Sequence, residues 1–523
     1  MIDIPIKNLG DMPCYDQAVA CYASVHNRRY EMLFAGSWGF EYREEASAEK
    51  IGERIKSRAV LNMNYLKRYH GIEIIKKEVK VNENLLDILE EEIDQGNPVM
   101  IFISTYYFPW NEHYKKFENN LPHAMLAVGV DREKECIYCV DCMLKKQNVP
   151  LSFDDLLNGN NGKYWTIRCL PDYDKEIDVE EVFNYSINKL KRNTQELKDI
   201  QDIMRLADAM RQGFDLKKEI DNTHGGIWIE PIIFNLGGIM ADRANFVRLI
   251  DFILEQKEDY NIRRVKENME KITLEWNQIR GMLLKGYFLT NADNLVKKVI
   301  DRLERTASLE ENTVQLIENW KEKKEIYIKN KEAVDIKEPD QITFVPIKNY
   351  YNNQSFGIYN EKQSVANIDG MRYFFYVDET VNKEIWELRR MKFYHEPIKG
   401  KQNDSIKCYG QTIAVASNDY DCIMLMGYGD LSSFEEEIEI QYKDDTSIMV
   451  SIEVPDSAIP NPFIKNTMIW NGRCGFIDEI EEHAWDVGIY AMLYRIERKA
   501  LKAIKLPICP NIVLFAISLG KYE

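Results

Sequence analysis

One of the ten cysteines, Cys14, occupies a position where a thiol can act as a nucleophile. It directly follows Pro13, and a helix is predicted from about Pro13 to His26, with Asp11 as its N-cap. Unpaired backbone N–H groups and the helix dipole favour an anion at this end of a helix, and therefore favour the thiolate form. Cys14 is the candidate nucleophile.

A nucleophilic cysteine needs a base, and the base needs a group that orients it. His123 lies at the start of one predicted strand, and Asp141 follows the next. Antiparallel strands joined by a short turn bring such side chains together. The order Cys, His, Asp along the chain is that of papain-like enzymes. Asn8 precedes Cys14, where its amide could donate to an oxyanion together with the backbone N–H of Cys14.

Each of these residues also has a purely structural interpretation. A single cysteine is more often a core residue, and a histidine beside a strand is usually structural. An aspartate after a strand is most often a turn residue, and Asn8 fits an ordinary loop equally well. The three residues in this order, with His and Asp linked by a predicted hairpin, favour catalysis.

Cys136, Cys139 and Cys142 have a spacing that can hold a metal cluster. A fourth ligand is not evident nearby, and strand alternation would place Cys136 and Cys139 on opposite faces. The pattern favours buried thiols, so no metal is expected.

The elements that must position these residues are predicted from hydrophobic periodicity. Residues 1–172 carry two further helical patterns and three strand-like runs, in an α+β order. The helices are predicted at 48–69 and 85–95, and the strands at 99–104, 124–130 and 136–140.

Two further regions follow. Residues 173–336 have helical periodicity and are predicted to form a helical bundle, with helices over 178–211, 241–256, 263–284, 291–306 and 311–330. After a linker at 337–340, residues 341–523 carry many short strand patterns, which predict a β-sandwich. The fold class is therefore multidomain α+β.

Composition limits the class of protein. There are 68 Lys and Arg against 85 Asp and Glu, a formal net charge of −17, which argues against binding to nucleic acid. The N-terminus lacks a secretory signal, and no apolar run reaches the roughly 20 residues of a membrane span. A cytoplasmic protein with reduced cysteines and no membrane contact is expected.

Several motifs are similar to one known family. They are Cys14 heading a helix, Asn97-Pro98-Val99, the aromatic stretch from Thr105 to Trp110, His113-Tyr114, His123, Gly129-Val130-Asp131 and Asp141. This pattern resembles the N-terminal domain of the butirosin-biosynthesis protein H family, which looks like the peptidase C39 branch of the papain fold. The resemblance covers roughly residues 10–170. The last third of the chain resembles galactose-binding or carbohydrate-binding jelly rolls.

The resemblance implies amide-forming acyl transfer in antibiotic or secondary-metabolite biosynthesis. An acyl chain would leave the phosphopantetheine thioester of an acyl or peptidyl carrier protein, rest on Cys14, and pass to a small amine. His123 would be the general base and acid and Asp141 the orienting residue, with no other cofactor. Related triads often have Asp-Pro at the third position, whereas Cys142 follows Asp141 here, so the local turn is expected to differ.

Tyr106, Tyr107, Trp110 and His113 could line the substrate site, or could be core and rim aromatics. The acidic surface would attract a cationic amine, whereas a carrier protein would need a local patch of lysines. Two alternatives remain open: a cysteine peptidase or thioesterase with the same triad, and a non-catalytic ligand-binding protein. The acyl donor, the acceptor and the oligomeric state, including a homodimer, are not determined by the sequence.

Overall fold

The computed structural model describes residues 1–522 except 8–11, 45–47, 80–83, 112–113, 117–121, 175, 222–225, 258, 322–338, 360, 362–364, 459–466 and 477–484. Its contacts group the chain into two compact units. The first holds Met1–Leu206, Asn222–Thr273 and Arg305–Ile326, and the second holds Ala207–Asp221, Leu274–Glu304 and Tyr327–Glu523. The division into domains 1–172, 173–336 and 341–523 stays a prediction.

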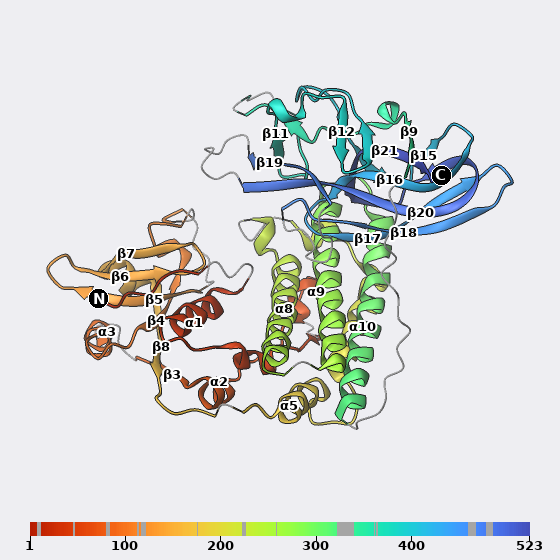
Figure 1. The fold of residues 1–523 in the computed structure, drawn as a ribbon. Helices are drawn as coiled ribbons and strands as arrows, with labels where there is room; N and C mark the ends of the chain where they lie inside the picture. Colours follow the sequence, from red (N-terminus) through yellow and green to blue (C-terminus); the bar gives the residue numbers. More distant parts are fainter. Residues whose placement is uncertain are drawn as a thin grey trace. The chain divides into compact units, whose positions relative to one another are not determined.

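The first unit contains a six-stranded antiparallel sheet (Figure 1). Its strands, in spatial order, are β3 (Ile72–Glu78), β8 (Asn160–Cys169), β4 (Val99–Ser104), β5 (Pro122–Asp131), β6 (Cys136–Asp141) and β7 (Lys146–Ser152). The strands predicted at 99–104, 124–130 and 136–140 are confirmed as β4, β5 and β6. The sequence patterns did not reveal β3, β7 and β8.

Helices on both sides of this sheet bury its apolar residues. α3 (Leu85–Asp94) packs Leu85, Leu89 and Ile93 against alternate residues of the sheet, including Met125 of β5. α1 (Cys14–Val25) contacts the same strand at Ala124, the neighbouring residue. This arrangement of helices against an antiparallel sheet is the predicted α+β fold.

The helix predicted over residues 48–69 is wrong for its first half. That stretch holds a 3₁₀ turn (Ile51–Arg54) and the short strand β2 (Ile55–Lys56), which pairs with β1 (Glu41–Tyr42). Only α2 (Met63–His70) is helical, because the side chain of Asn62 accepts a hydrogen bond from the N–H of Tyr65 and begins the helix there.

The helical region consists of α5 (Val179–Lys191), α6 (Lys198–Gly213), α7 (Leu216–Glu219), α8 (Pro231–Gln256), α9 (Tyr260–Tyr287) and α10 (Asp293–Lys321). The helices predicted at 291–306 and 311–330 form one helix, α10, up to Lys321. In the described part of the chain, no helix is long and apolar enough to span a bilayer.

A buried ion pair in the first unit joins α8 to α10. Arg243 of α8 donates to Glu310 of α10 at 3.0 Å, and both side chains are fully buried. Trp38 donates its indole N–H to the other carboxylate oxygen of Glu310 at 2.9 Å, and Arg243 also donates to the carbonyl of Gly39. These bonds fix the chain around residue 38 against both helices.

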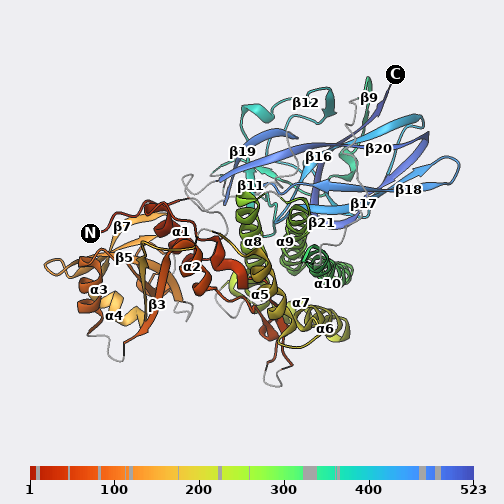
Figure 2. The same ribbon diagram turned by 60° about the horizontal axis from the view of Figure 1, so that its bottom comes forward.

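The second unit contains an 11-stranded sheet. Its central strands β16 (Asp419–Gly429), β20 (Trp485–Lys505) and β21 (Ile508–Lys521) lie side by side, with β16 between the other two (Figure 2). β20 continues past β16 to pair with β17 (Phe434–Tyr442), so the sheet curls. The predicted β-rich C-terminal region is confirmed.

A second, smaller layer faces this sheet. It is the hairpin of β12 (Ile385–Leu388) and β13 (Met391–Tyr394). Trp386 and Phe393 of the hairpin share an apolar core with Met426 of β16 and Phe515 of β21. The expected two-layered sandwich therefore consists of one large curled sheet and one hairpin.

Candidate active site

Cys14 is the first residue of α1, where the sequence places it. The preceding Pro13 has an extended backbone (φ −55°, ψ 152°), so the helix begins at the cysteine. The Sγ atom accepts a hydrogen bond from the backbone N–H of Ala124 on β5, at 3.3 Å. This donor and the N–H groups of the first helical turn present positive partial charge to the sulfur.

His123, at the start of β5, is the base that faces this sulfur. Its Nε2 donates to Oδ2 of Asp141 at 2.9 Å, and the ring also forms a hydrogen bond with the side chain of Cys14. Burial opposes a charge on the ring, but the hydrogen bonds to Asp141 and to Cys14 outweigh it and raise the pKa of His123 to about 10. The ring is therefore an imidazolium at neutral pH, the counterion that a thiolate needs.

Asp141 ends β6 and is fully buried. Its Oδ1 accepts from the backbone N–H of Leu144 at 3.0 Å, in the turn that leads to β7. Its Oδ2 accepts from the indole N–H of Trp110 at 3.0 Å as well as from His123. Burial opposes its charge, but the bonds to His123, to the Leu144 N–H and to Trp110 keep the pKa of Asp141 below its usual value. Cys142, which replaces the expected proline, does not prevent this turn from holding the carboxylate.

The structure thus brings together Cys14, His123 and Asp141, and their catalytic roles stay a prediction. Asn8 and His113 lie outside the described residues. Trp110 is close to the triad, but it binds the carboxylate of Asp141 instead of facing the sulfur.

Tyr106 and Tyr107 have another neighbour. Their rings lie 5.2 and 4.6 Å from the ammonium of Lys115, which also pairs with Asp155 at 2.6 Å. These contacts hold the loop after β4, so both tyrosines have a structural role here, and their contact with substrate remains a prediction.

Two contacts at the site are not visible in the sequence. The ring of Phe108, fully buried, lies 5.3 Å from that of His123 and packs against one side of it. Asp16, in the first turn of α1, accepts a hydrogen bond from Asn245 of α8 at 2.7 Å, while its second oxygen has no partner. Burial raises the pKa of Asp16 to about 8. No local signal could reveal this pair, because Asn245 lies 229 residues away.

The other cysteines near the site are buried thiols. Cys139 is enclosed in the core of the sheet, and burial raises its pKa. Cys21, two turns below Cys14, contacts Cys142, and this contact lowers the pKa of Cys21 and raises that of Cys142. Cys14 differs from these in being partly exposed and in facing an imidazole.

A known protein family matches part of the N-terminal region. Residues 17–142 match the family model of the N-terminal region of butirosin biosynthesis protein H. The matched segment includes His123 and Asp141 and begins three residues after Cys14. This part of the chain is therefore similar to butirosin biosynthesis protein H.

Among solved structures, one similar chain is a protein described as a C39-like peptidase from Bacillus anthracis. The identity is 13%, over 31% of this chain and 93% of the other, with a TM-score of 0.23. No curated protein matches the chain.

Proposed function

We propose that the protein is a cysteine acyltransferase that moves an acyl group from a thioester to an amine through an acyl-Cys14 intermediate. The observation that carries this proposal is the Cys14–His123–Asp141 geometry at the amino end of α1. The similarity of residues 17–142 to a biosynthetic protein family supports synthesis of an amide as the outcome.

The proposed reaction has two steps, acylation of Cys14 and transfer of the acyl group to the amine. The thiolate of Cys14 attacks the thioester carbonyl, and the departing thiol takes the proton of the His123 imidazolium. The amine then attacks the acyl-Cys carbonyl, neutral His123 removes a proton from it, and Cys14 is released as thiolate. The backbone N–H of Cys14 is the donor that we assign to the oxyanion formed in each step.

Two features support an amine, instead of water, as the acceptor. The chain carries a formal net charge of −17, which attracts a cationic amine toward the protein. Phe108 and Trp110 pack around His123 and Asp141, so that water has little access to the base on that side. An amine bound and oriented next to the intermediate would then react faster than water.

The partners that we propose follow from this chemistry. The donor is an acyl or peptidyl chain on the phosphopantetheine arm of a carrier protein, and the acceptor is a small amine. The setting is the biosynthesis of an antibiotic or another secondary metabolite in the cytoplasm.

The test uses a small acyl thioester of N-acetylcysteamine, which mimics the end of the pantetheine arm. Intact-mass spectrometry should detect one acyl group on the wild-type protein and none on Cys14→Ala. Cys169→Ser is the matched control, because Cys169 is also reduced and partly exposed, and this variant should keep the adduct.

Product analysis then separates transfer from hydrolysis. With a diamine present, amide should form at the expense of free acid. Free acid as the only product, whatever the amine, would contradict the transferase proposal and identify a hydrolase. An adduct that persists in Cys14→Ala would contradict both.

A further inference from the structure

Two buried carboxylates lie beside the first turn of α1, the helix that begins with Cys14. One of them is Asp16, in that turn, with 1% of its surface exposed. Its Oδ2 accepts a hydrogen bond from the amide of Asn245 on α8 at 2.7 Å, and its Oδ1 has no hydrogen-bond partner in the described part of the chain. A buried carboxylate oxygen without a partner is costly, so a donor from outside the fold would be bound there favourably.

The second carboxylate is Asp242 of α8, which is also buried. Asp242 and Asn245 are three residues apart on this helix and therefore share a face. Because Asn245 binds Asp16, this spacing places Asp242 next to Asp16. Burial raises the pKa of Asp16 to about 8, and the charge of Asp242 acts in the same direction. Two neighbouring carboxylates repel each other, and a bound cation would remove that repulsion.

Three basic side chains approach this carboxylate pair, and each is bonded to another group. Arg248 donates to the amide oxygen of Asn245 at 2.9 Å, and Arg243 donates to Glu310 at 3.0 Å. Lys189 donates to two backbone carbonyls. The charges of these side chains lower the pKa values of the two carboxyls, but burial outweighs them. The pair therefore retains an affinity for a further cation.

The pair and the sulfur of Cys14 lie on different sides of α1. Cys14 accepts a hydrogen bond from β5, whereas Asp16 accepts one from α8. An offset of two residues turns side chains roughly 200° apart on a helix. Tyr15, half-buried, lies between them in the sequence, and burial together with the charges of Asp16, Asp242 and Cys14 raises the pKa of its phenol. A cation bound at the pair is therefore near Cys14 without touching the sulfur.

We propose that Asp16 and Asp242 form the subsite that holds the acceptor of the acyl group. They bind a positively charged amino group of the acceptor, while a second amino group of the same molecule reacts at Cys14. This inference rests on the acyl transfer proposed above and assigns the residues that select the acceptor. A buried ion pair discriminates strongly, because charges attract each other more in a dry site than in water.

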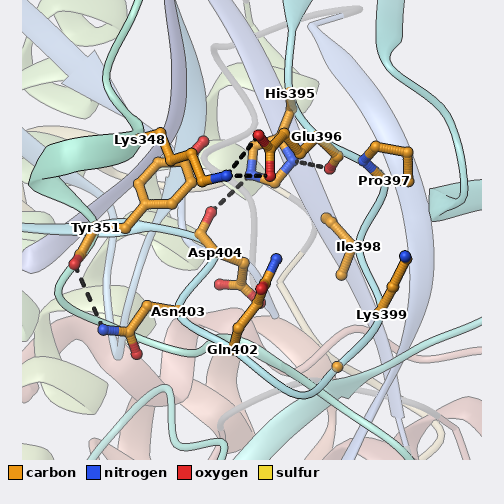
Figure 3. Close-up of a pocket in the computed structure, with 11 residues that line it drawn as sticks. Lys348, Tyr351, His395, Glu396, Pro397, Ile398, Lys399, Gln402, Asn403 and Asp404 are labelled. Carbon is orange, nitrogen blue, oxygen red and sulfur yellow. Dashed lines mark hydrogen bonds and ion pairs between the residues drawn. The ribbon is translucent and has the colours of Figure 1, made fainter.

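The pocket in the second unit is less suited to a cation. It has a volume of about 240 Å³ and lies between the turn at residues 348–351 and the loop 395–404 (Figure 3). Its carboxylate Glu396 is already paired with Lys348 at 2.7 Å, and Lys399 adds a further ammonium group to the lining. A cation there would meet like charges, whereas at α1 it meets two carboxylates.

The binding experiment uses the full chain with Cys14→Ala, so that acyl transfer does not contribute to the signal. Isothermal titration calorimetry is carried out with unbranched diamines of about three to six carbons. Each diamine is compared with the amino alcohol of the same length, in which a hydroxyl replaces one ammonium. About 0.15 M salt screens the exposed charges of the acidic surface. At least one diamine should bind saturably, and about tenfold or more tightly than its amino alcohol.

Three variants locate the binding. Asp16→Asn and Asp242→Asn should each weaken diamine binding by about tenfold or more, because each removes one charge of the pair. Both keep an oxygen for the bond from Asn245 or from Ser57, so the fold should be retained, which thermal unfolding checks. Asp251→Asn is the matched control, because Asp251 is an exposed carboxylate of the same helix that pairs with Lys266, and binding should be unchanged.

Kinetics with Cys14 present separate acceptor binding from a structural role. Asp16→Asn and Asp242→Asn should raise the KM for the diamine by about tenfold, which is more than they slow the formation of acyl-Cys14. A structural role would slow both steps alike.

Three results would overturn the inference. They are equal binding of diamines and amino alcohols, undiminished diamine binding in both pair variants, and an equal loss in Asp251→Asn. These results leave the proposed function intact if the acyl adduct on Cys14 and the amide are still formed. The absence of an adduct would refute the proposed function, while the calorimetric result would stand by itself.

Discussion

Replacing Asp141 by asparagine should remove most of the charge on His123 at neutral pH. The hydrogen bond to Asp141 is the strongest of the interactions that raise the pKa of His123 to about 10, while burial acts in the opposite direction. Without the carboxylate, the pKa should fall toward its ordinary value near 6.5, by about three units. At about 1.4 kcal/mol per pKa unit, the protonated form of His123 loses on the order of 4 kcal/mol of stabilisation relative to the neutral form.

Two measurements check this prediction. An NMR titration of the His123 ring should have its midpoint near 10 in the wild type and several units lower in Asp141→Asn. The rate of enzyme acylation at neutral pH should fall by about 10² to 10⁴. Asp131→Asn is the matched control, because Asp131 ends β5, the strand that carries His123, but binds Lys134 at the surface. If Asp141→Asn is folded and its His123 titrates as in the wild type, the role assigned to Asp141 is refuted.

The same substitution has a consequence for stability. His123 has a higher pKa in the folded chain than in the unfolded chain, so its contribution is fully present below pH 6.5. It is lost as the pH rises through about 10. The free energy of unfolding of the wild type should therefore decline between these two values. In Asp141→Asn the decline should be much smaller.

Three further substitutions test other contacts. Trp110→Phe removes the indole donor from Asp141 and should lower kcat/KM by about 10- to 100-fold, measured with the thioester; an unchanged kcat/KM would show that this bond does not serve catalysis. Burial raises the pKa of the Asp16 carboxyl to about 8, so the wild type should lose stability as the pH rises from about 4 to 8. Asp16→Asn should abolish this loss. If the free energies of unfolding of the two proteins, measured across that range, run parallel, the idea is wrong. Glu310→Leu leaves Arg243 buried without a counterion and should destabilise the first unit by about 3 to 5 kcal/mol in thermal denaturation, whereas a change below about 1 kcal/mol would contradict the importance of this pair.

The parts of the site that depend on local patterns could be predicted from the sequence. Pro13 marks the start of α1, and the apolar runs of β4, β5 and β6 end at turn residues. The ends of these four elements could therefore be predicted to within two residues. The short connection between β5 and β6 then brings His123 beside Asp141.

The parts that depend on distant contacts could not be predicted. Residues 51–56 have helical periodicity, but the chain there pairs with Glu41–Tyr42 and packs Gly52 tightly against Ile232 of α8. Tertiary contacts override local propensity at such places. The partner of Asp16 is likewise on α8, and the donor Trp110 follows a strand that offers no sign of its target.

The bonds of Glu310 have a consequence for the order in which the protein can mature on the ribosome. Trp38 is synthesised 272 residues before the carboxylate that it binds. At typical elongation rates, this delay is on the order of tens of seconds. During that time the segment around residue 38 has emerged while the carboxylate that will fix it has not been synthesised. The segment around residue 38 therefore cannot form its native bond to Glu310 until α10 has left the exit tunnel.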